Sequence, residues 1–198
     1  KHPTWHMGSK ITVDCATLVN KAFEVIEASV LFDFPLEKVD AIICRESLVH
    51  AEIVYKDSTG THTLLEYSPC SMKVAISYAL SKGQLSMHKN NQEDINNIRK
   101  LHFMDIDHEF YPLFDVTRKV FDKYSNVGMI YYNAVDTYAI SSFLKKKITF
   151  KQLRDSLIYA SSHMENLPVL DERKLDSIIA QSEEYAKDIV WKVVSLSR

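Results

Sequence analysis

One helical stretch near the start of the chain constrains the fold more than any other feature. After a short apolar segment, Lys10 to Asp14, that reads as a strand, the chain follows a helical period to about Val30. At ~100° per residue, the polar members of this helix fall within roughly one third of its circumference. They are Thr17, Asn20, Lys21, Glu24 and Glu27. Such a helix is either embedded in a domain with its polar strip facing a cavity or a ligand, or partly buried with a solvated stripe.

Composition excludes several function classes. The 198 residues carry a net charge of −2 with a pI near 6.5, which gives no electrostatic reason to expect a nucleic acid or an anionic membrane as partner. The three cysteines, Cys15, Cys44 and Cys70, are odd in number and lack CxxC spacing. They predict neither a disulfide framework nor a structural zinc site, and they favour a reducing compartment. No apolar run approaches the ~20 residues of a membrane span.

The first nine residues are predicted to form a loop, because Pro3 and Gly8 interrupt any regular period. Large side chains at Trp5 and Met7 suit a loop that closes over a ligand, and a frayed terminus is the alternative. The chain opens on Lys1 rather than on methionine, so we expect it to be part of a longer protein.

The middle of the chain predicts strands. Val39 to Ile43, Leu48 to Tyr55 and Thr61 to Tyr67 have strand character, and the turn Asp57-Ser-Thr-Gly60 joins the last two into an antiparallel hairpin. A helix is expected from Met72 to Ser81, ending at Gly83. These features predict a mixed α/β unit over residues 1–83 and a polar linker over residues 84–110.

The last part of the chain, residues 111–198, has the pattern of a helical domain. There are four helical periods: Asn126 and Gly128 separate the first pair and Pro168 separates the last pair, with Thr149 and Asp171 as N-caps. They cover roughly Tyr111 to Ser125, Met129 to Lys146, Thr149 to Glu165, and Asp171 to Leu196. Short links between such helices predict a small antiparallel four-helix bundle, so the fold class is α+β.

Two further side chains are chemical candidates. His50 lies on a predicted strand, where a histidine is more often a core or supporting group than a catalyst. Cys15 lies where the predicted strand meets the helix, and a helix N-terminus would favour its thiolate. Neither GxGxxG nor GxxxxGK[ST] occurs, so the chain carries no nucleotide-binding fingerprint of its own.

These residues resemble a known family. The pattern of the first 28 residues is His2-Pro-x-Trp5-x-Met7-Gly8-x-Lys10-Ile-x-Val-Asp14-x-Ala16-Thr17-x-x-Asn20-Lys21-x-x-Glu24-x-Ile26-Glu27-Ala28. It is similar to the central segment of 1-deoxy-D-xylulose 5-phosphate reductoisomerases. The similarity continues more loosely through Ser47 and His50, Met72, Asn133-Ala134 and Phe143-Leu144.

The resemblance implies an enzyme of isoprenoid precursor synthesis. Its family reduces and rearranges a sugar phosphate with NADPH and Mg2+ or Mn2+, as a homodimer, in the bacterial cytoplasm or a plastid-type organelle. This sequence resembles the second half of the catalytic domain and the C-terminal helical domain. The NADPH-binding domain and two further acidic metal ligands would lie upstream, so we expect the isolated chain to be inactive. Nucleic acid and membrane are not expected partners.

The resemblance also assigns roles to individual residues. Glu24 matches a metal ligand, and Asn20 and Lys21 match residues that hold the substrate's phosphate and hydroxyl groups. Cys15 stands where the family has a phosphate-binding serine. The other matches are the substrate-binding lid residues His2, Trp5 and Met7, the site-lining His50, and Gly8 and Met72 on the cofactor side. Glu24, Lys21 and His50 are the expected catalytic set.

The sequence departs from the family pattern at four places. Ala22 replaces a glycine, Cys44-Arg45-Glu46 replaces His-Pro-Gln, Glu66 to Ser71 lacks the usual Gly-x-Pro-Asp, and Asp136-Thr137 replaces Asn-Glu. Two interpretations therefore stay open. One is part of a reductoisomerase, and the other is a non-catalytic homologue that binds a phosphorylated ligand or serves as a structural module.

Overall fold

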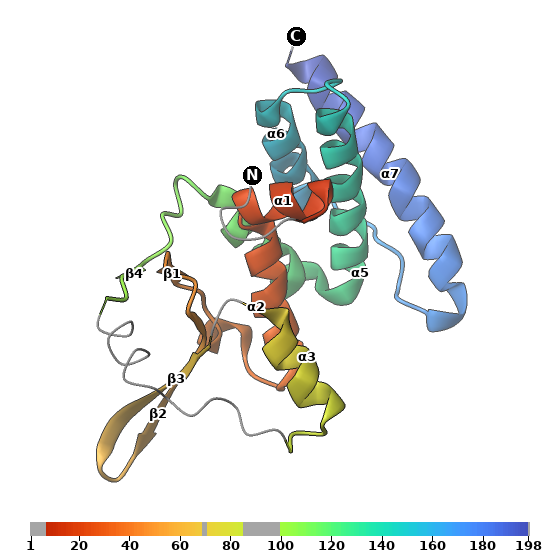
Figure 1. The fold of residues 1–198 in the computed structure, drawn as a ribbon. Helices are drawn as coiled ribbons and strands as arrows, with labels where there is room; N and C mark the ends of the chain where they lie inside the picture. Colours follow the sequence, from red (N-terminus) through yellow and green to blue (C-terminus); the bar gives the residue numbers. More distant parts are fainter. Residues whose placement is uncertain (1–6, 69–70, 85–99, 198) are drawn as a thin grey trace. The chain divides into compact units, whose positions relative to one another are not determined.

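A computed structural model describes residues 7–68, 71–84 and 100–197 of the chain (Figure 1). Its helices and small antiparallel sheets confirm the α+β fold class. The chain divides into two compact units, one formed by Lys1–Ala41 together with Asp107–Arg198 and the other by Ile42–Ile106. Within the described ranges, none of the helices is long and apolar enough to cross a membrane.

The first unit is built around one long central helix. Figure 1 shows α5, α6 and α7 side by side, with α1 lying across α5. The bounds are α1 Ser9–Ala16, α2 Val19–Leu31, η1 Leu36–Lys38, α5 Pro112–Leu144, α6 Phe150–Ser161, η2 Glu172–Lys174 and α7 Leu175–Leu196. Side chains from α2, α5, α6 and α7 form the core; its fully buried members include Val19, Tyr132, Val135, Leu153, Leu157 and Val190.

The break in α5 lies where the sequence predicts two helices. Ser125 has non-helical backbone angles (φ 51°, ψ −150°), so two helical segments meet there at a kink. Gly128 follows one turn later, and a Cβ at that position would lie only 2.4 Å from the Cβ of Tyr124. A larger residue at 128 would therefore clash with the preceding turn.

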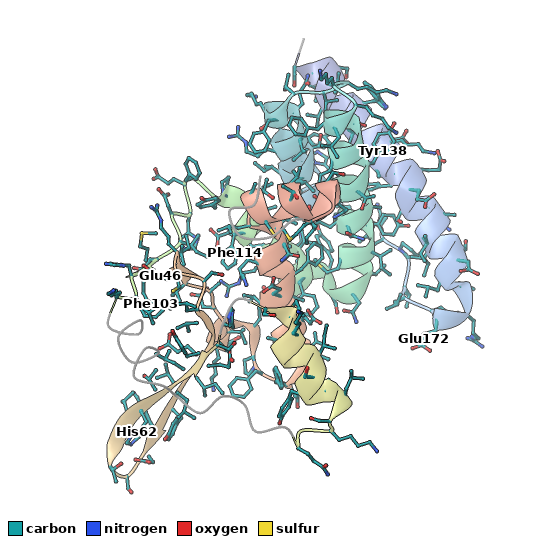
Figure 2. The ribbon with its side chains drawn as sticks, viewed as in Figure 1. Glu46, His62, Phe103, Phe114, Tyr138 and Glu172 are labelled. Carbon is teal, nitrogen blue, oxygen red and sulfur yellow. The ribbon has the colours of Figure 1, made fainter. Side chains whose placement is uncertain are left out.

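The second unit contains short antiparallel ladders. Strand β2 (Val49–Asp57) pairs with β3 (Gly60–Tyr67) as the predicted hairpin, β1 (Ile43–Cys44) pairs with β4 (Phe103–Met104), and α3 spans Met72–Leu80. At the hairpin turn Asp57 Oδ1 accepts a hydrogen bond from the Thr59 amide, and Gly60 adopts φ 140°. Figure 2 shows His62 near the tip of this hairpin.

The replaced stretch Cys44-Arg45-Glu46 takes part in joining β1 to β4. The Glu46 carboxylate accepts a hydrogen bond from the His102 backbone amide at 3.2 Å and lies 2.7 Å from Nδ1 of the same histidine. Cys44 Sγ also contacts Glu46, at 3.5 Å. Figure 2 places Glu46 beside Phe103, the first residue of β4 and the one after His102. Cys44 and Glu46 thus have a structural role within the second unit.

Two strand predictions are wrong. Lys10 to Asp14 belongs to helix α1, and Val39 to Ile43 contributes only its last residue to a strand, after the short η1 turn. The alternation of Ile11 and Val13 suggested a strand, but Lys10 and Asp14 pair across one helical turn. Tertiary contacts override weak local strand propensity in so short a segment.

The two units differ from the predicted domains, 1–83 and 111–198 with a linker between them. Residues of α2 pack against α5, so the helix that carries the polar strip belongs with the helical unit. Most of the predicted linker, residues 85–99, lies outside the described residues. Its last part contains β4 and the buried Ile106, which belong to the second unit.

The cap of α6 provides a test of this fold. Thr149 Oγ1 accepts a hydrogen bond from the Gln152 backbone amide, and Gln152 Oε1 accepts one from the Thr149 backbone amide, which completes a capping box. Replacing Thr149 by alanine should lower the free energy of unfolding by about 1 kcal/mol, whereas Thr149→Ser should retain most of it. Urea denaturation followed by circular dichroism measures both, and equal stability of all three proteins would contradict the assignment.

Candidate functional site

A sharp corner between α1 and α2 shapes the candidate site. Leu18 adopts the left-handed conformation (φ 58°, ψ 14°), which is uncommon for a residue other than glycine. Just before it, Thr17 is buried and donates its hydroxyl to the Val13 carbonyl at 3.1 Å. Thr17 is therefore not part of the polar strip of α2, in contrast to the sequence prediction. The corner ends α1 and allows α2 to start in a new direction.

The polar strip of α2 forms one connected group. Asn20 Nδ2 donates to Glu24 Oε1 at 2.5 Å, and the Lys21 ammonium forms an ion pair with Glu24 Oε2. The side chains of Lys21 and Glu24 are 45% and 46% exposed, whereas Ala22 and Val25 are buried. The helix is thus embedded along one side and presents an amide, an ammonium and a carboxylate together on the other.

Cys15 lies within electrostatic reach of this group. Its thiol is partly buried, and burial raises its pKa above the ordinary value. The negative charges of Glu24 and Asp14 raise this pKa further, while Lys21 opposes the increase. The sequence-based expectation of a favoured thiolate is wrong, because Cys15 lies in the last turn of α1 and not at a helix N-terminus. Cys15 is therefore a neutral, weak hydrogen-bond donor near neutral pH.

A buried charge network beneath the corner was missed at the sequence level. Lys10 Nζ lies 2.8 Å from Asp14 Oδ2 and 2.5 Å from Asp136 Oδ2 on α5. Burial and the neighbouring Asp14 carboxylate raise the pKa of Asp136, although Lys10 opposes this. Burial alone would lower the pKa of Lys10, but the two carboxylates raise it above its ordinary value. The departure from the family pattern at Asp136 thus corresponds to a buried partner for Lys10.

The remaining predicted site residues are placed as follows. Gly8 is the N-cap of α1 and its carbonyl accepts bonds from Thr12, while Met7 just before it is partly buried. His50 on β2 and Met72 on α3 belong to the second unit, and His50 Nε2 lies 3.1 Å from the Ser68 carbonyl oxygen. The predicted lid residues His2 and Trp5 lie outside the described residues.

The donor set of the described residues does not by itself make a divalent metal site. No group of three or more His, Cys, Asp or Glu side chains among them converges as metal ligands. Glu24 supplies one carboxylate, whereas Mg2+ and similar hard ions take about six oxygen ligands. The sheets of the described residues are two-stranded and antiparallel, unlike the parallel sheet that holds a dinucleotide. Ligands for both groups would have to come from outside this part of the protein.

One cavity lies beside the candidate site and shares only Asn20 with it. It has a volume of about 1010 Å3 and lies between α1, α2, α5 and α7. Figure 2 shows Tyr138, one of its lining residues, on the side of α5 toward α7, where Trp191 donates to its hydroxyl at 2.9 Å. Because Cys15, Lys21 and Glu24 do not line this cavity, we place the candidate site on the exposed strip of α2.

Two family models match the chain. Residues 1–32 match the family model of the 1-deoxy-D-xylulose 5-phosphate reductoisomerase C-terminal domain. Residues 67–187 match a second model, that of the DXP reductoisomerase C-terminal domain, which covers more than half of the chain. The chain belongs to the 1-deoxy-D-xylulose 5-phosphate reductoisomerase family.

Individual members of the family match over nearly the whole chain. The reductoisomerase of Lysinibacillus sphaericus is 34% identical over 192 residues, 96% of this chain and 49% of that protein. That of Pseudothermotoga lettingae is 37% identical over 190 residues, 96% of this chain and 51% of that protein. The chain thus spans about half the length of these reductoisomerases.

Solved reductoisomerase structures share the fold. A complex with NADPH, fosmidomycin and magnesium gives a TM-score of 0.81 at 23% identity, covering 99% of this chain and 48% of that one. The Zymomonas mobilis enzyme in complex with NADPH gives 0.78 at 23% identity, covering 91% of this chain and 47% of that one. At this level of identity the likeness supports the fold alone.

The reactivity of Cys15 tests the arrangement of the strip. In a background with Cys44→Ser and Cys70→Ser, Glu24→Gln should lower the thiol pKa and speed alkylation by iodoacetamide at neutral pH, because only the thiolate reacts. Lys21→Gln should have the opposite effect, since it removes the charge that favours the thiolate. Rates followed by mass spectrometry measure both changes.

Glu27→Gln is the matched control for this measurement. Glu27 is exposed on the same helix but is not among the charges that shift the pKa of Cys15. Its replacement should leave the alkylation rate unchanged. Equal effects of the Glu24 and Glu27 variants would mean that Glu24 does not lie close to Cys15.

Proposed function

We propose that this chain is the C-terminal half of a reductoisomerase that converts 1-deoxy-D-xylulose 5-phosphate to 2-C-methyl-D-erythritol 4-phosphate with NADPH in isoprenoid precursor synthesis. Membership in the family supports this activity, and the coverage of about half of each relative supports the assignment to one half of the enzyme. One observation of the structure carries the proposal: Asn20, Lys21 and Glu24 lie together on an exposed strip beside Cys15.

This strip has the chemistry needed to hold a sugar phosphate. The Lys21 ammonium is a compact charge that suits a phosphate dianion, and the Asn20 amide can donate to and accept from sugar hydroxyls. Both side chains now bond to Glu24, so binding would exchange these internal contacts for contacts to the substrate. Holding the phosphate, which is remote from the reacting carbons, uses binding energy to orient the substrate.

The proposed enzyme takes a divalent metal and NADPH, and the ligands of the similar structures support this. We assign Glu24 as the one metal ligand that this part of the chain contributes, with Mg2+ or Mn2+ as the ion. The other ligands and the dinucleotide-binding domain would come from the part of a reductoisomerase that this chain does not span. Hydride from NADPH supplies the reduction.

A homodimer in a bacterial cytoplasm or a plastid-type organelle is part of the same proposal. The bacterial sources of the relatives reported above favour the bacterial location. The competing function is a non-catalytic homologue that binds a phosphorylated ligand through the same strip. The neutral Cys15 thiol, a weaker donor than a serine hydroxyl, is the observation that favours this second candidate.

Activity measurements on the full-length protein and its Glu24→Gln variant distinguish a reductoisomerase from a non-catalytic homologue. In the full-length protein, Glu24→Gln should lower kcat/KM by more than about 100-fold, because a metal ligand is lost, while the circular dichroism spectrum stays unchanged. Glu27→Gln, three residues along the exposed side of α2, should retain activity. An active Glu24→Gln enzyme would remove Glu24 from the site, and an inactive unmodified full-length protein would favour the non-catalytic homologue.

A substitution at Cys15 should strengthen substrate binding instead of weakening the enzyme. Cys15→Ser replaces a weak thiol donor by a hydroxyl and should lower KM for the sugar phosphate about 3- to 10-fold, the equivalent of one added hydrogen bond. Cys15→Ala is the control, because it removes the donor, and it should raise KM slightly. A higher KM in the serine variant would contradict a phosphate-binding role at this position.

A further inference from the structure

Helix α1 depends on tertiary contacts to hold its place. It has eight residues, fewer than the ~12 that an isolated helix needs in water. Its N-cap is Gly8, which has no side chain to cap it, and its first turn carries no acidic residue. Asp14 is its one buried side chain, and Val13 is partly buried against the core. Apolar packing therefore gives α1 little attachment to the rest of the unit.

The Lys10 network supplies the missing attachment. Asp136, on the second segment of α5, is 1% exposed and reaches Lys10 across 126 positions of sequence. Asp14 is also buried, and its Oδ1 has no hydrogen-bond partner among the described residues. Lys10 thus joins one carboxylate of α1 to one of α5. Direct pairs of this kind restrict how two elements can slide, because a shifted partner leaves a buried charge unpaired.

The network lies next to residues of the candidate site. Asp14 precedes Cys15 directly, and the Leu18 corner then leads into Asn20 and Lys21. Lys10 and Asp14 also line the same cavity as Asn20. On the other side, Met7 and Gly8 of the predicted lid lead into α1. The position of α1 therefore determines where Cys15 lies relative to the strip of α2.

We propose that Asp136 is a positioning residue that holds α1 on α5 through Lys10 and so fixes Cys15 beside Lys21 and Glu24. Asp136 itself is buried on a helix of the core and does not belong to the exposed strip. It acts through Lys10 and the first helix. The structural part of this inference is independent of the proposed function, and its effect on catalysis rests on that function.

Hydrogen exchange of the full-length protein tests the structural part. Asp136→Asn keeps the shape of the side chain and removes its charge, and it should speed amide exchange in α1 by about 10-fold relative to α6. Lys10→Met should have a larger effect, and Lys10→Arg, which keeps the charge, should restore most of the protection. Asp122→Asn, on an exposed part of α5, is the matched control and should change nothing.

Two functional readouts complete the test. Alkylation of Cys15 should be faster in Asp136→Asn than in the unmodified protein, whether or not the protein has activity. In an active enzyme, Asp136→Asn should raise KM for 1-deoxy-D-xylulose 5-phosphate to about the same small extent as Cys15→Ala, with kcat unchanged, a split that uniform loss of folded protein would not produce.

The outcomes distinguish this inference from the proposed function. Unchanged α1 exchange in both Asp136→Asn and Lys10→Met would overturn the attachment. Faster α1 exchange with an unchanged KM in an active enzyme would overturn the positioning role. If the unmodified protein has no activity, the proposed function fails, and α1 exchange together with Cys15 alkylation decides the positioning of Cys15.

Discussion

Burial of one side of α2 against α5 is the contact on which the rest of the site depends. Val19 and Ala22 are fully buried, and Val19 belongs to the same core cluster as the residues of α5, α6 and α7. Once that side is buried, the helical period turns Asn20, Lys21 and Glu24 outward together. Apolar packing thus determines the direction of the polar strip, and the bonds to Glu24 determine how its members meet.

The charges close to this helix have two different environments. The exposed group of Lys21 and Glu24 can exchange its internal contacts for a ligand at small cost, because water screens and replaces them. In the group of Lys10, Asp14 and Asp136, the two carboxylates are buried and the Lys10 side chain is 39% exposed, so breaking the group would leave buried carboxylates without their partner. The exposed pair therefore suits ligand binding, and the group around Lys10 suits holding two helices in a fixed position. Both groups lie within residues 10–24, and the buried group adds one partner residue, Asp136, in α5.

A family relationship and a local geometry support different parts of the function. The family matches support the proposed reaction on a sugar phosphate. The geometry supports the proposal that Asn20, Lys21 and Glu24 are the side chains of this chain that would meet the substrate. Among the described residues, no group of three or more His, Cys, Asp or Glu side chains could hold a metal and the sheets are two-stranded, so the proposed chemistry needs ligands from the part of a reductoisomerase that this chain does not span.

Local sequence determined much of this protein. The period of α2, the hairpin turn at Asp57 to Gly60, the Thr149 cap and the break near Gly128 are all short-range signals, and the structure contains each of them. Only the tertiary structure decided that Lys10 to Asp14 is helical, that α2 belongs with the C-terminal helices, and that Asp136 pairs with Lys10. These features depend on contacts between residues far apart in sequence, which no local period or propensity records.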